Sequence, residues 1–277
     1  MMNAPTAAPV DRLSATFARA RKAGRAALIG HLPACYPTIE DSITALCTLS
    51  WHADVLTVGL PEDPALRHQH DQAPQTALAA AMEILHEVSA SISIPIVLAS
   101  SWEPIERAGA RNTAAELVAA GAVGVVLPDL PPTGMAAARW LRAATSYRLA
   151  TSFLAARGQL ANAATVSTGW VYLPTAADPA RTAGVVDLAD LHERTRDVRH
   201  MTAAPICTGA GITTPELAAA TAFGVDGVII DSAFRQALQP AAGQKADISR
   251  LDRCATRYAA ALRTVPGGRQ LIPAPQY

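Results

Sequence analysis

The sequence predicts an α/β protein, a (β/α)8 TIM barrel with one extra N-terminal helix. Short apolar segments alternate with helical segments along most of the chain, which gives eight strand–helix units. The strands are continuously apolar, as in a parallel sheet that is buried on both faces. A length of 277 residues, half of them hydrophobic, suits one large α/β domain. An open doubly wound sheet is the alternative, but it would need fewer, longer units, and no GxGxxG follows the first strand.

We expect a single TIM-barrel domain over residues 1–277. The barrel core extends from about residue 25 to about residue 240, and residues 241–277 hold a closing helix and an irregular tail. The first helix is expected at Leu13–Lys22, with Leu13, Phe17 and Ala20 on one side. Thr38 and Asp41 resemble a capping box at the start of the second helix.

The other elements follow from the same patterns. Strands are expected at Ala26–Leu32, Val55–Leu60, Ile94–Ala99, Val123–Leu127, Leu149–Leu154, Trp170–Leu173, Pro205–Thr208 and Gly227–Ile230. Further helices are expected at Gln75–Val88, Ala114–Ala120, Met135–Ala144, Leu160–Val166, Leu188–Arg196 and Ile248–Leu262. Another helix begins at Thr214 and closes at Gly224.

The last two strand–helix units look like a phosphate cup. Gly209-Ala210-Gly211 permits a tight turn, and Thr214 is a candidate N-cap. The final strand leads into Asp231 and Ser232, where another helix begins. Neighbouring strands that each end at a helix N-terminus are typical of phosphate sites in barrels. The alternative is two ordinary βα units without a ligand.

Composition excludes several classes of function. The formal net charge is zero and the pI is about 7.1, which argues against nucleic acid or an anionic membrane as the main partner. No apolar run is long enough for a transmembrane helix, and no signal peptide is recognisable. The widely spaced cysteines favour reduced thiols in the cytoplasm. His68, His70 and Asp71 lack a third distant ligand, so we expect no metal site.

Five segments resemble the tryptophan synthase α subunit family, the indole-glycerol-phosphate lyases. The segments are Arg25–Ser42, Ala53–Pro64, Ile94–Ile105, Gly124–Pro132, and GAGITTPEL with GVDGVIIDSAF. Their order and spacing match from about Arg12 to Leu238. The resemblance implies a (β/α)8 barrel with an extra N-terminal helix, no cofactor, and a pyridoxal-phosphate β subunit as the family's partner.

The chain departs from the family pattern at positions that carry chemistry. The family's strand two reads A-D-x-x-E-L-G-x-P, and its glutamate is the general acid/base; Thr57 stands there. The second family carboxylate falls near Arg67 or Asp71. Asp231 replaces a phosphate-site glycine, and at about 4 Å and a dielectric of about 20 each unit-charge pair with a phosphate would repel by about 4 kcal/mol. We therefore expect an unphosphorylated substrate.

Residues at the carboxyl ends of the strands are the candidates for function, because barrel active sites lie there. We expect Asp231, Glu62 and His31 to be catalytic, although Asp231 could be a helix cap, Glu62 a solvated loop residue and His31 a packing residue. Asp129 belongs to a turn, so we expect it to be structural. The expected substrate-binding residues are Thr57, Ser100, Ser101, Trp102, Tyr172, Thr208, Gly209, Gly211 and Ser232.

Three functions are compatible with these residues. The preferred one is a divergent barrel enzyme, repurposed for lyase, cyclisation or elimination chemistry on a small substrate in specialised metabolism. The second is a catalytically inactive homologue that serves as a binding or scaffold partner. The third is an atypical indole-3-glycerol-phosphate lyase. The loop that carries part of the family's β-subunit contacts is rewritten, so we expect no stable pairing with a tryptophan synthase β subunit.

Overall fold

The computed structural model describes residues 8–60, 74–175, 186–239 and 246–263. Its strands are β1 Ala27–Pro33, β2 Val55–Gly59, β3 Ile96–Ala99, β4 Gly124–Leu127, β5 Ala150–Phe153, β6 Val171–Pro174, β7 Ile206–Gly209 and β8 Gly227–Ile230. Its helices are α1 Pro9–Lys22, α2 Ile39–Leu49, α4 Pro74–Ser91, α5 Trp102–Ala108, α6 Ala110–Ala119, α7 Gly134–Ser146, α8 Leu160–Val166, α10 Leu188–Arg199, α11 Pro215–Thr221, α12 Ser232–Leu238 and α13 Ile248–Arg263.

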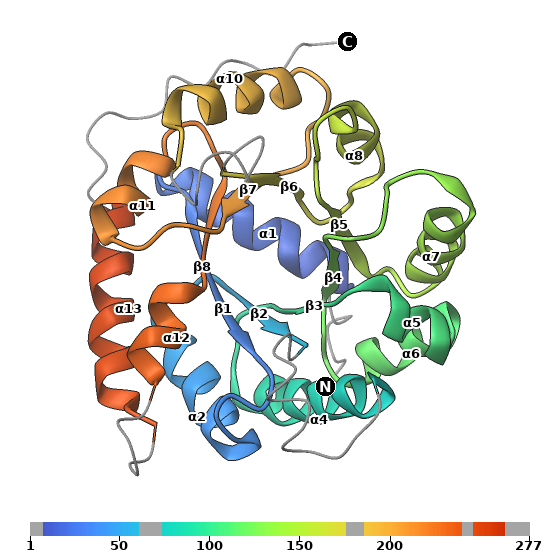
Figure 1. Ribbon diagram of the computed structural model, residues 1–277, viewed down its shortest axis with the longest axis horizontal. Helices are drawn as coiled ribbons and strands as arrows, with labels where there is room; N and C mark the ends of the chain where they lie inside the picture. Colours follow the sequence, from blue (N-terminus) through green and yellow to red (C-terminus); the bar gives the residue numbers. More distant parts are fainter. Residues whose placement is uncertain (1–7, 61–73, 176–185, 240–245, 264–277) are drawn as a thin grey trace, which may run out of the picture.

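The strands form one parallel sheet that curls into a nearly closed barrel. Their order is β5-β4-β3-β2-β1-β8-β7-β6. A parallel bridge between Leu154 and Tyr172 joins the two ends of this order. Figure 1 looks along the barrel and shows the other helices around the strands, with α1 across the centre. The predicted (β/α)8 fold with an extra N-terminal helix is therefore confirmed.

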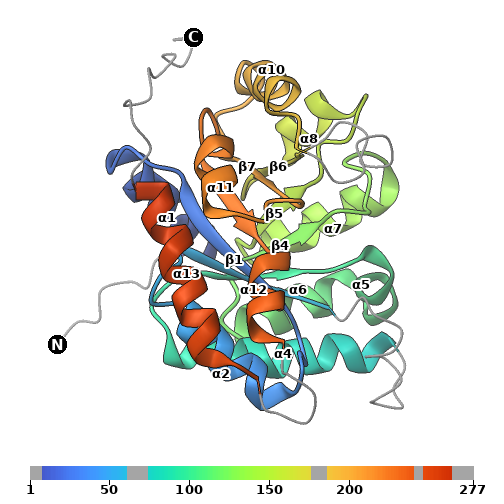
Figure 2. The same cartoon turned by 60° about the vertical axis from the view of Figure 1, so that its left-hand side comes forward.

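The extra helix closes one end of the barrel. Leu13, Phe17 and Ala20 of α1 are at most 3% exposed. They belong to one apolar cluster with the lumen residues Ala27 and Ile29. Figure 2 shows α1 beside the strands at this end. The predicted apolar side of the first helix thus fills the amino-terminal end of the lumen, which leaves the carboxyl ends of the strands for a site.

Two helices begin at the expected capping residues. Thr38 accepts a hydrogen bond from the Asp41 N–H, and Thr214 accepts one from the Leu217 N–H. Helix α11 ends at Thr221, earlier than expected, and Gly224 with φ +90° turns the chain toward β8.

Helix α5 was not among the expected helices. Pro104 is the third residue of α5, where its missing N–H needs no intrahelical acceptor. Gly109, with φ +89°, then separates α5 from α6.

Asp226 ties together four elements at the amino-terminal end of the barrel. Its carboxylate is 4% exposed and pairs with Arg21 of α1 at 3.1 Å and with Arg199 of α10 at 2.5 Å. It also accepts the Ile206 N–H at the start of β7. Arg25 and Asp54 form a second, bidentate pair at this end, with distances of 2.6 and 2.8 Å. Hydrogen bonding to the Asp54 carboxylate raises the pKa of the Arg25 guanidinium. The amino-terminal end is therefore a structural end.

In the described part of the chain, no helix has the length and apolar character that a membrane span requires. The assignment of residues 1–277 to a single domain stays a prediction.

Replacing Asp226 by alanine should destabilise the barrel strongly, since two arginines and a buried N–H lose their acceptor. We expect the free energy of unfolding to fall by about 3–5 kcal/mol, as for other broken buried ion pairs. Urea denaturation measures this change. The control is Asp11→Ala, which removes an exposed pair with Arg148 and should cost less than about 1 kcal/mol. Equal losses in the two variants would contradict the structural role of Asp226.

Candidate active site

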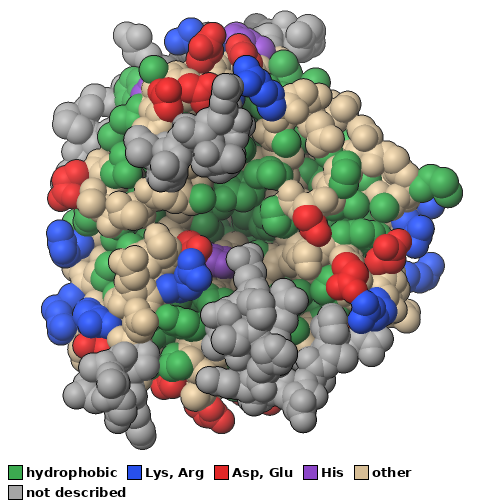
Figure 3. Space-filling view, viewed as in Figure 1, with side chains coloured by type: hydrophobic (Ala, Val, Ile, Leu, Met, Phe, Trp, Pro, Cys, Tyr) green, Lys and Arg blue, Asp and Glu red, His purple; other side chains and the backbone are tan. Residues whose placement is uncertain are grey.

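The lumen of the barrel ends in a layer of polar groups. Alternate residues of a strand face the same side, and Ile29 of β1 and Val55 of β2 belong to the lumen cluster. His31 and Thr57, two positions further along these strands, therefore face the lumen nearer the carboxyl ends. The parallel register pairs His31 directly with Thr57. Figure 3 shows a hollow at the centre of the view along the barrel, with a histidine and charged side chains beside it.

His31 and Thr57 are hydrogen bonded to each other. His31 Nδ1 lies 2.9 Å from Thr57 Oγ1, and the Thr57 hydroxyl donates to the Gly30 carbonyl at 3.4 Å. Thr57 is 2% exposed, whereas His31 is half-buried. The threonine is thus a fixed partner and the imidazole is the group that can reach a ligand.

Gly59 makes room for this imidazole. A Cβ atom at Gly59 would lie 2.8 Å from His31 Cε1 and 2.9 Å from Nε2, so any other residue there would force the ring to shift. The end of β2 therefore accommodates the ring that β1 supplies.

Asp231 lies at the end of β8 and is paired with an arginine. Ile230 is in register with Gly30, so Asp231 and His31 are the next residues on neighbouring strands. Arg235 Nε lies 2.7 Å from Asp231 Oδ1, and an Arg235 terminal nitrogen donates to Oδ2 at 3.3 Å. Asp231 occupies the N-cap position of α12, but its side chain makes no capping hydrogen bond. Its charge is thus balanced by Arg235 within the same turn of helix.

The turn after β7 has the expected strained backbone. Ala210 and Gly211 have φ values of 68° and 70°, so two consecutive residues are left-handed. A Cβ at Gly209 would lie 2.7 Å from the Ile229 Cβ. Ser232, the first residue of α12, is half-buried on the neighbouring unit. Gly209, Gly211 and Ser232 therefore belong to adjacent strand ends, as the cup requires.

The residues after β3 face a different environment. Ser100 is 3% exposed and donates to the Ser101 carbonyl. The Trp102 N–H donates to both carboxylate oxygens of Asp129, each at 3.0 Å, which fixes the start of α5. The Trp102 ring packs edge-on against the buried Trp140, with ring centroids 6.5 Å apart. Asp129 is therefore structural, as expected, and Trp102 packs on the helix side of β3.

The remaining candidates divide between the two faces of the strands. Tyr172 of β6 is partly buried against the lumen cluster. Thr208 is fully buried and follows the lumen residue Cys207, so its side chain faces the helices. Glu62, together with Asp63, Arg67, His68, His70 and Asp71, lies outside the described residues.

Thiol and metal chemistry have little support in the described part. Burial raises the pKa values of Cys35, Cys47 and Cys254, which favours the protonated thiols. Among the described residues, no group of three or more His, Cys, Asp or Glu side chains is placed to hold a metal.

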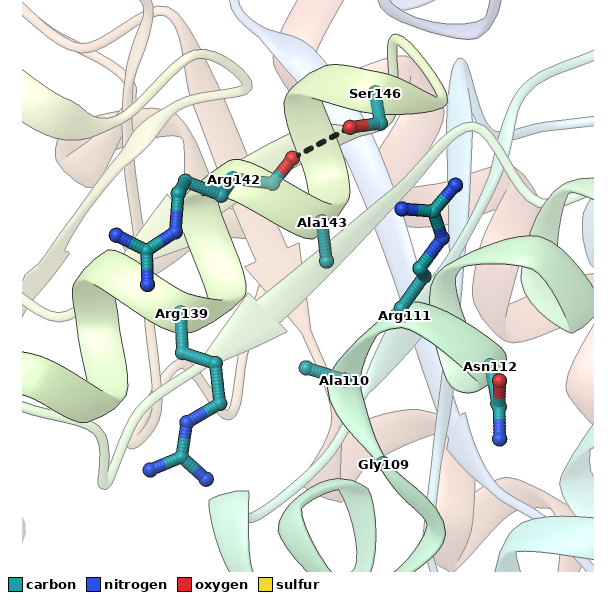
Figure 4. Close-up of a pocket in the computed structure, with 8 residues that line it drawn as sticks. All are labelled: Gly109, Ala110, Arg111, Asn112, Arg139, Arg142, Ala143 and Ser146. Atoms are coloured by element: carbon teal, nitrogen blue, oxygen red, sulfur yellow. Dashed lines mark hydrogen bonds between the residues drawn. The ribbon is translucent and has the colours of Figure 1, made fainter.

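A cavity of about 520 Å³ lies outside the barrel, between α6 and α7. Figure 4 shows Arg111 on the α6 side and Arg139 and Arg142 on the α7 side, with Ala110 and Ala143 between them. It shares no residue with the strand-end set, so it is not the candidate active site.

Two features of the site were missed from the sequence. Arg235 stands four residues after Asp231 at a helix start, and this i, i+4 spacing could have indicated the ion pair. The contact between His31 and Thr57 depends on the register of β1 and β2, which no local pattern specifies.

A family model and two curated relatives indicate one family. Residues 17–263 match the family model described as tryptophan synthase alpha chain. The alpha chain from Streptomyces coelicolor is 35% identical over 81% of this chain and 87% of its own length. The alpha chain from Streptomyces avermitilis is 33% identical over 91% and 94%.

Solved structures agree with this assignment. A tryptophan synthase structure from M. tuberculosis has a TM-score of 0.75 and 29% identity, and the match covers 91% of this chain and 98% of that chain. The alpha chain from Legionella pneumophila has a TM-score of 0.78 at 22% identity, with 92% and 98% covered, and supports the fold alone.

Two expectations are wrong in view of these similarities. The relatives are named as tryptophan synthase alpha chains, which contradicts a repurposed enzyme of specialised metabolism. The expectation of no stable β pairing conflicts with the similarity to solved structures of tryptophan synthase itself. The physical error was to treat Asp231 as an uncompensated charge, although Arg235 pairs with it. The chain belongs to the tryptophan synthase alpha chain family.

Proposed function

We propose that this protein is the α chain of a tryptophan synthase, that it releases indole from indole-3-glycerol phosphate, and that it pairs with a β subunit. The observation that carries the proposal is the family match over residues 17–263, which spans all eight strand ends. The strand-end layer of His31, Thr57 and Asp231 supplies polar groups at the mouth of an otherwise apolar lumen.

The phosphate of the substrate would bind at the ends of β7 and β8. Gly211 and Ser232 match family phosphate residues, and the left-handed turn at Ala210 and Gly211 suits exposed backbone N–H groups. The pairing of Arg235 with Asp231 removes the repulsion that an isolated carboxylate would exert on a dianion. Tyr172, on the lumen side of β6, would contact the indole ring. Glu62, Ser100, Ser101, Trp102 and Thr208 stay predictions as site residues.

Pairing with a β subunit is supported by the similarity to tryptophan synthase from M. tuberculosis over 91% of this chain. In the described part of the chain, Cys35, Cys47, Cys207 and Cys254 form no disulfide, which suits a reducing compartment such as the cytoplasm.

A second candidate is an α chain that pairs with β but does not catalyse the lyase step. Thr57 is the observation that favours it, because a hydroxyl cannot relay a proton at neutral pH as the family's glutamate does. The two candidates differ in the chemistry at β2 and agree on the partner.

The first prediction is lyase activity. The purified chain, mixed with a tryptophan synthase β subunit, should release indole from indole-3-glycerol phosphate, because the chain belongs to the family and has its fold. Indole is measured by chromatography, with heat-denatured protein as the control. Complete absence of indole, alone and with β, would reject the lyase and leave the non-catalytic α chain.

The second prediction is a complex with β. Size-exclusion chromatography of equimolar mixtures should show a stoichiometric complex, because the chain is similar to solved tryptophan synthases over most of its length. An unrelated TIM barrel of similar size serves as the control. Separate elution of the two proteins at micromolar concentrations would contradict the proposed partner.

The third prediction concerns Arg235. Arg235→Gln should weaken the binding of inorganic phosphate by about 10-fold or more, because a hydrogen bond to a charged group contributes about 1.5–3 kcal/mol and each 1.4 kcal/mol is tenfold. Asp231→Asn should strengthen the binding, since it removes the competing negative charge. Isothermal titration calorimetry measures both.

The control for Arg235 is Arg148→Gln, which removes an arginine that pairs with Asp11 near the amino end of β5. It should leave phosphate binding unchanged. Equal affinity in wild type, Arg235→Gln and Asp231→Asn would show that the pair does not belong to an anion site.

A further inference from the structure

We propose that His31 is the acid–base residue of this chain, and that Thr57 is its positioning residue at the place where the family carries a catalytic glutamate. The inference rests on the proposed lyase function and deepens it. It assigns the proton transfer to a side chain of β1 in place of the missing carboxylate of β2.

The proposed acid–base role requires one tautomer of His31. Thr57 Oγ1 lies 2.9 Å from His31 Nδ1 and 3.4 Å from the Gly30 carbonyl oxygen, so a Thr57 hydroxyl that donates to Gly30 accepts from Nδ1. In this tautomer of the neutral imidazole, Nδ1 carries the proton and Nε2 carries the lone pair. This is the same arrangement by which many catalytic histidines are oriented through the ring nitrogen that does not react.

The position of Nε2 suits a substrate at the barrel mouth. The space that a Cβ of Gly59 would take is occupied by His31 Cε1 and Nε2, so the reactive edge of the ring lies over the end of β2. Thr57, on the same strand, is 2% exposed and lies within hydrogen-bond distance of the ring. The imidazole thus occupies the region that a longer side chain at position 57 would enter.

Among the described residues, the other acid–base groups near this layer are less suitable. Asp231, the next residue on the neighbouring strand, is held by Arg235 at 2.7 Å. Cys35 follows β1, and burial raises the pKa of its thiol. Tyr172 faces the lumen from β6, on the other side of the barrel order. Of the described histidines, only His31 lies on a strand of the barrel.

One imidazole can carry out both proton transfers that the release of indole requires. Release of indole breaks the bond between the indole ring carbon and the glycerol chain. The imidazolium first donates a proton to that ring carbon, and the neutral Nε2 then accepts the proton of the hydroxyl on the adjacent chain carbon. The electron pair of the broken bond returns to the ring, and the hydroxyl-bearing carbon becomes an aldehyde. One proton moves from oxygen to carbon, and nothing is oxidised or reduced.

The kinetic test uses the full chain with a β subunit. His31→Gln should lower kcat for indole release by about 10²–10⁴-fold, the usual contribution of general acid–base catalysis, with little change in KM. His200→Gln, at the exposed end of α10, is the matched histidine control and should behave as wild type. The double variant His31→Ala/Thr57→Glu should have a kcat about tenfold or more above that of His31→Ala, because the family's carboxylate then fills the space that the imidazole leaves.

A spectroscopic readout separates this inference from the activity itself. In ¹⁵N-labelled protein at pH 8, where an ordinary imidazole of pKa about 6.5 is neutral, NMR should show His31 protonated on Nδ1. Thr57→Val should shift the ring toward the Nε2–H form and lower kcat while KM stays unchanged. If Thr57 had only a structural role, Thr57→Val would leave the protonated nitrogen of His31 unchanged.

The outcomes distinguish the two proposals. A wild-type chain that releases no indole overturns the lyase function and the role of His31 together. An active wild type with His31→Gln within about threefold of it overturns His31 alone and leaves the lyase function standing. A wild-type His31 protonated on Nε2 at pH 8 overturns the hydrogen-bond assignment on which the proposal depends.

Discussion

The register between β1 and β2 is the constraint on which the site depends. His31 is opposite Thr57, and both continue the lumen positions begun by Ile29 and Val55. A slip of one residue would turn either side chain toward the helices, because the side-chain period of a strand is two. The ion pair of Arg25 and Asp54 supports this register, since it spans the starts of β1 and β2 and Asp54 also accepts the Leu28 N–H. The amino-terminal end of the barrel therefore fixes the geometry of the opposite end.

Charge balance explains how a family site can carry an aspartate beside its phosphate position. An uncompensated unit charge at about 4 Å would repel each phosphate charge by about 4 kcal/mol at a dielectric of about 20. Arg235 lies 2.7 Å from Asp231, so a phosphate would meet a neutral pair rather than a lone carboxylate. Both members are partly exposed, and water screens what remains of the field. An aspartate at position 231 therefore repels a phosphate strongly only when no arginine lies one helical turn further on.

The sequence was sufficient for the fold and insufficient for the site because the two depend on different distances along the chain. Continuous apolar strands and local caps such as Thr38 and Thr214 act within a few residues, and both are present in the structure as expected. Helix α5 was not expected, and its Pro104 lies in the first turn, where proline is tolerated. The His31–Thr57 contact joins residues 26 apart, and its geometry appears only when the strands pair. Thr208 follows the lumen residue Cys207 on β7, and its role in the site stays a prediction.

Thr57 can replace a glutamate without destabilising the barrel because its polar group is neutral and satisfied. Its hydroxyl is buried, yet it donates to Gly30 and accepts from His31, so little free energy of desolvation is left uncompensated. A carboxylate at the same depth would lose several kcal/mol of hydration unless a cation or several donors surrounded it. The half-buried imidazole needs no such compensation when neutral and can become charged near the solvent side of the mouth. Moving the titratable group from β2 to β1 thus keeps an acid–base function in the layer while the most buried position of that layer stays uncharged.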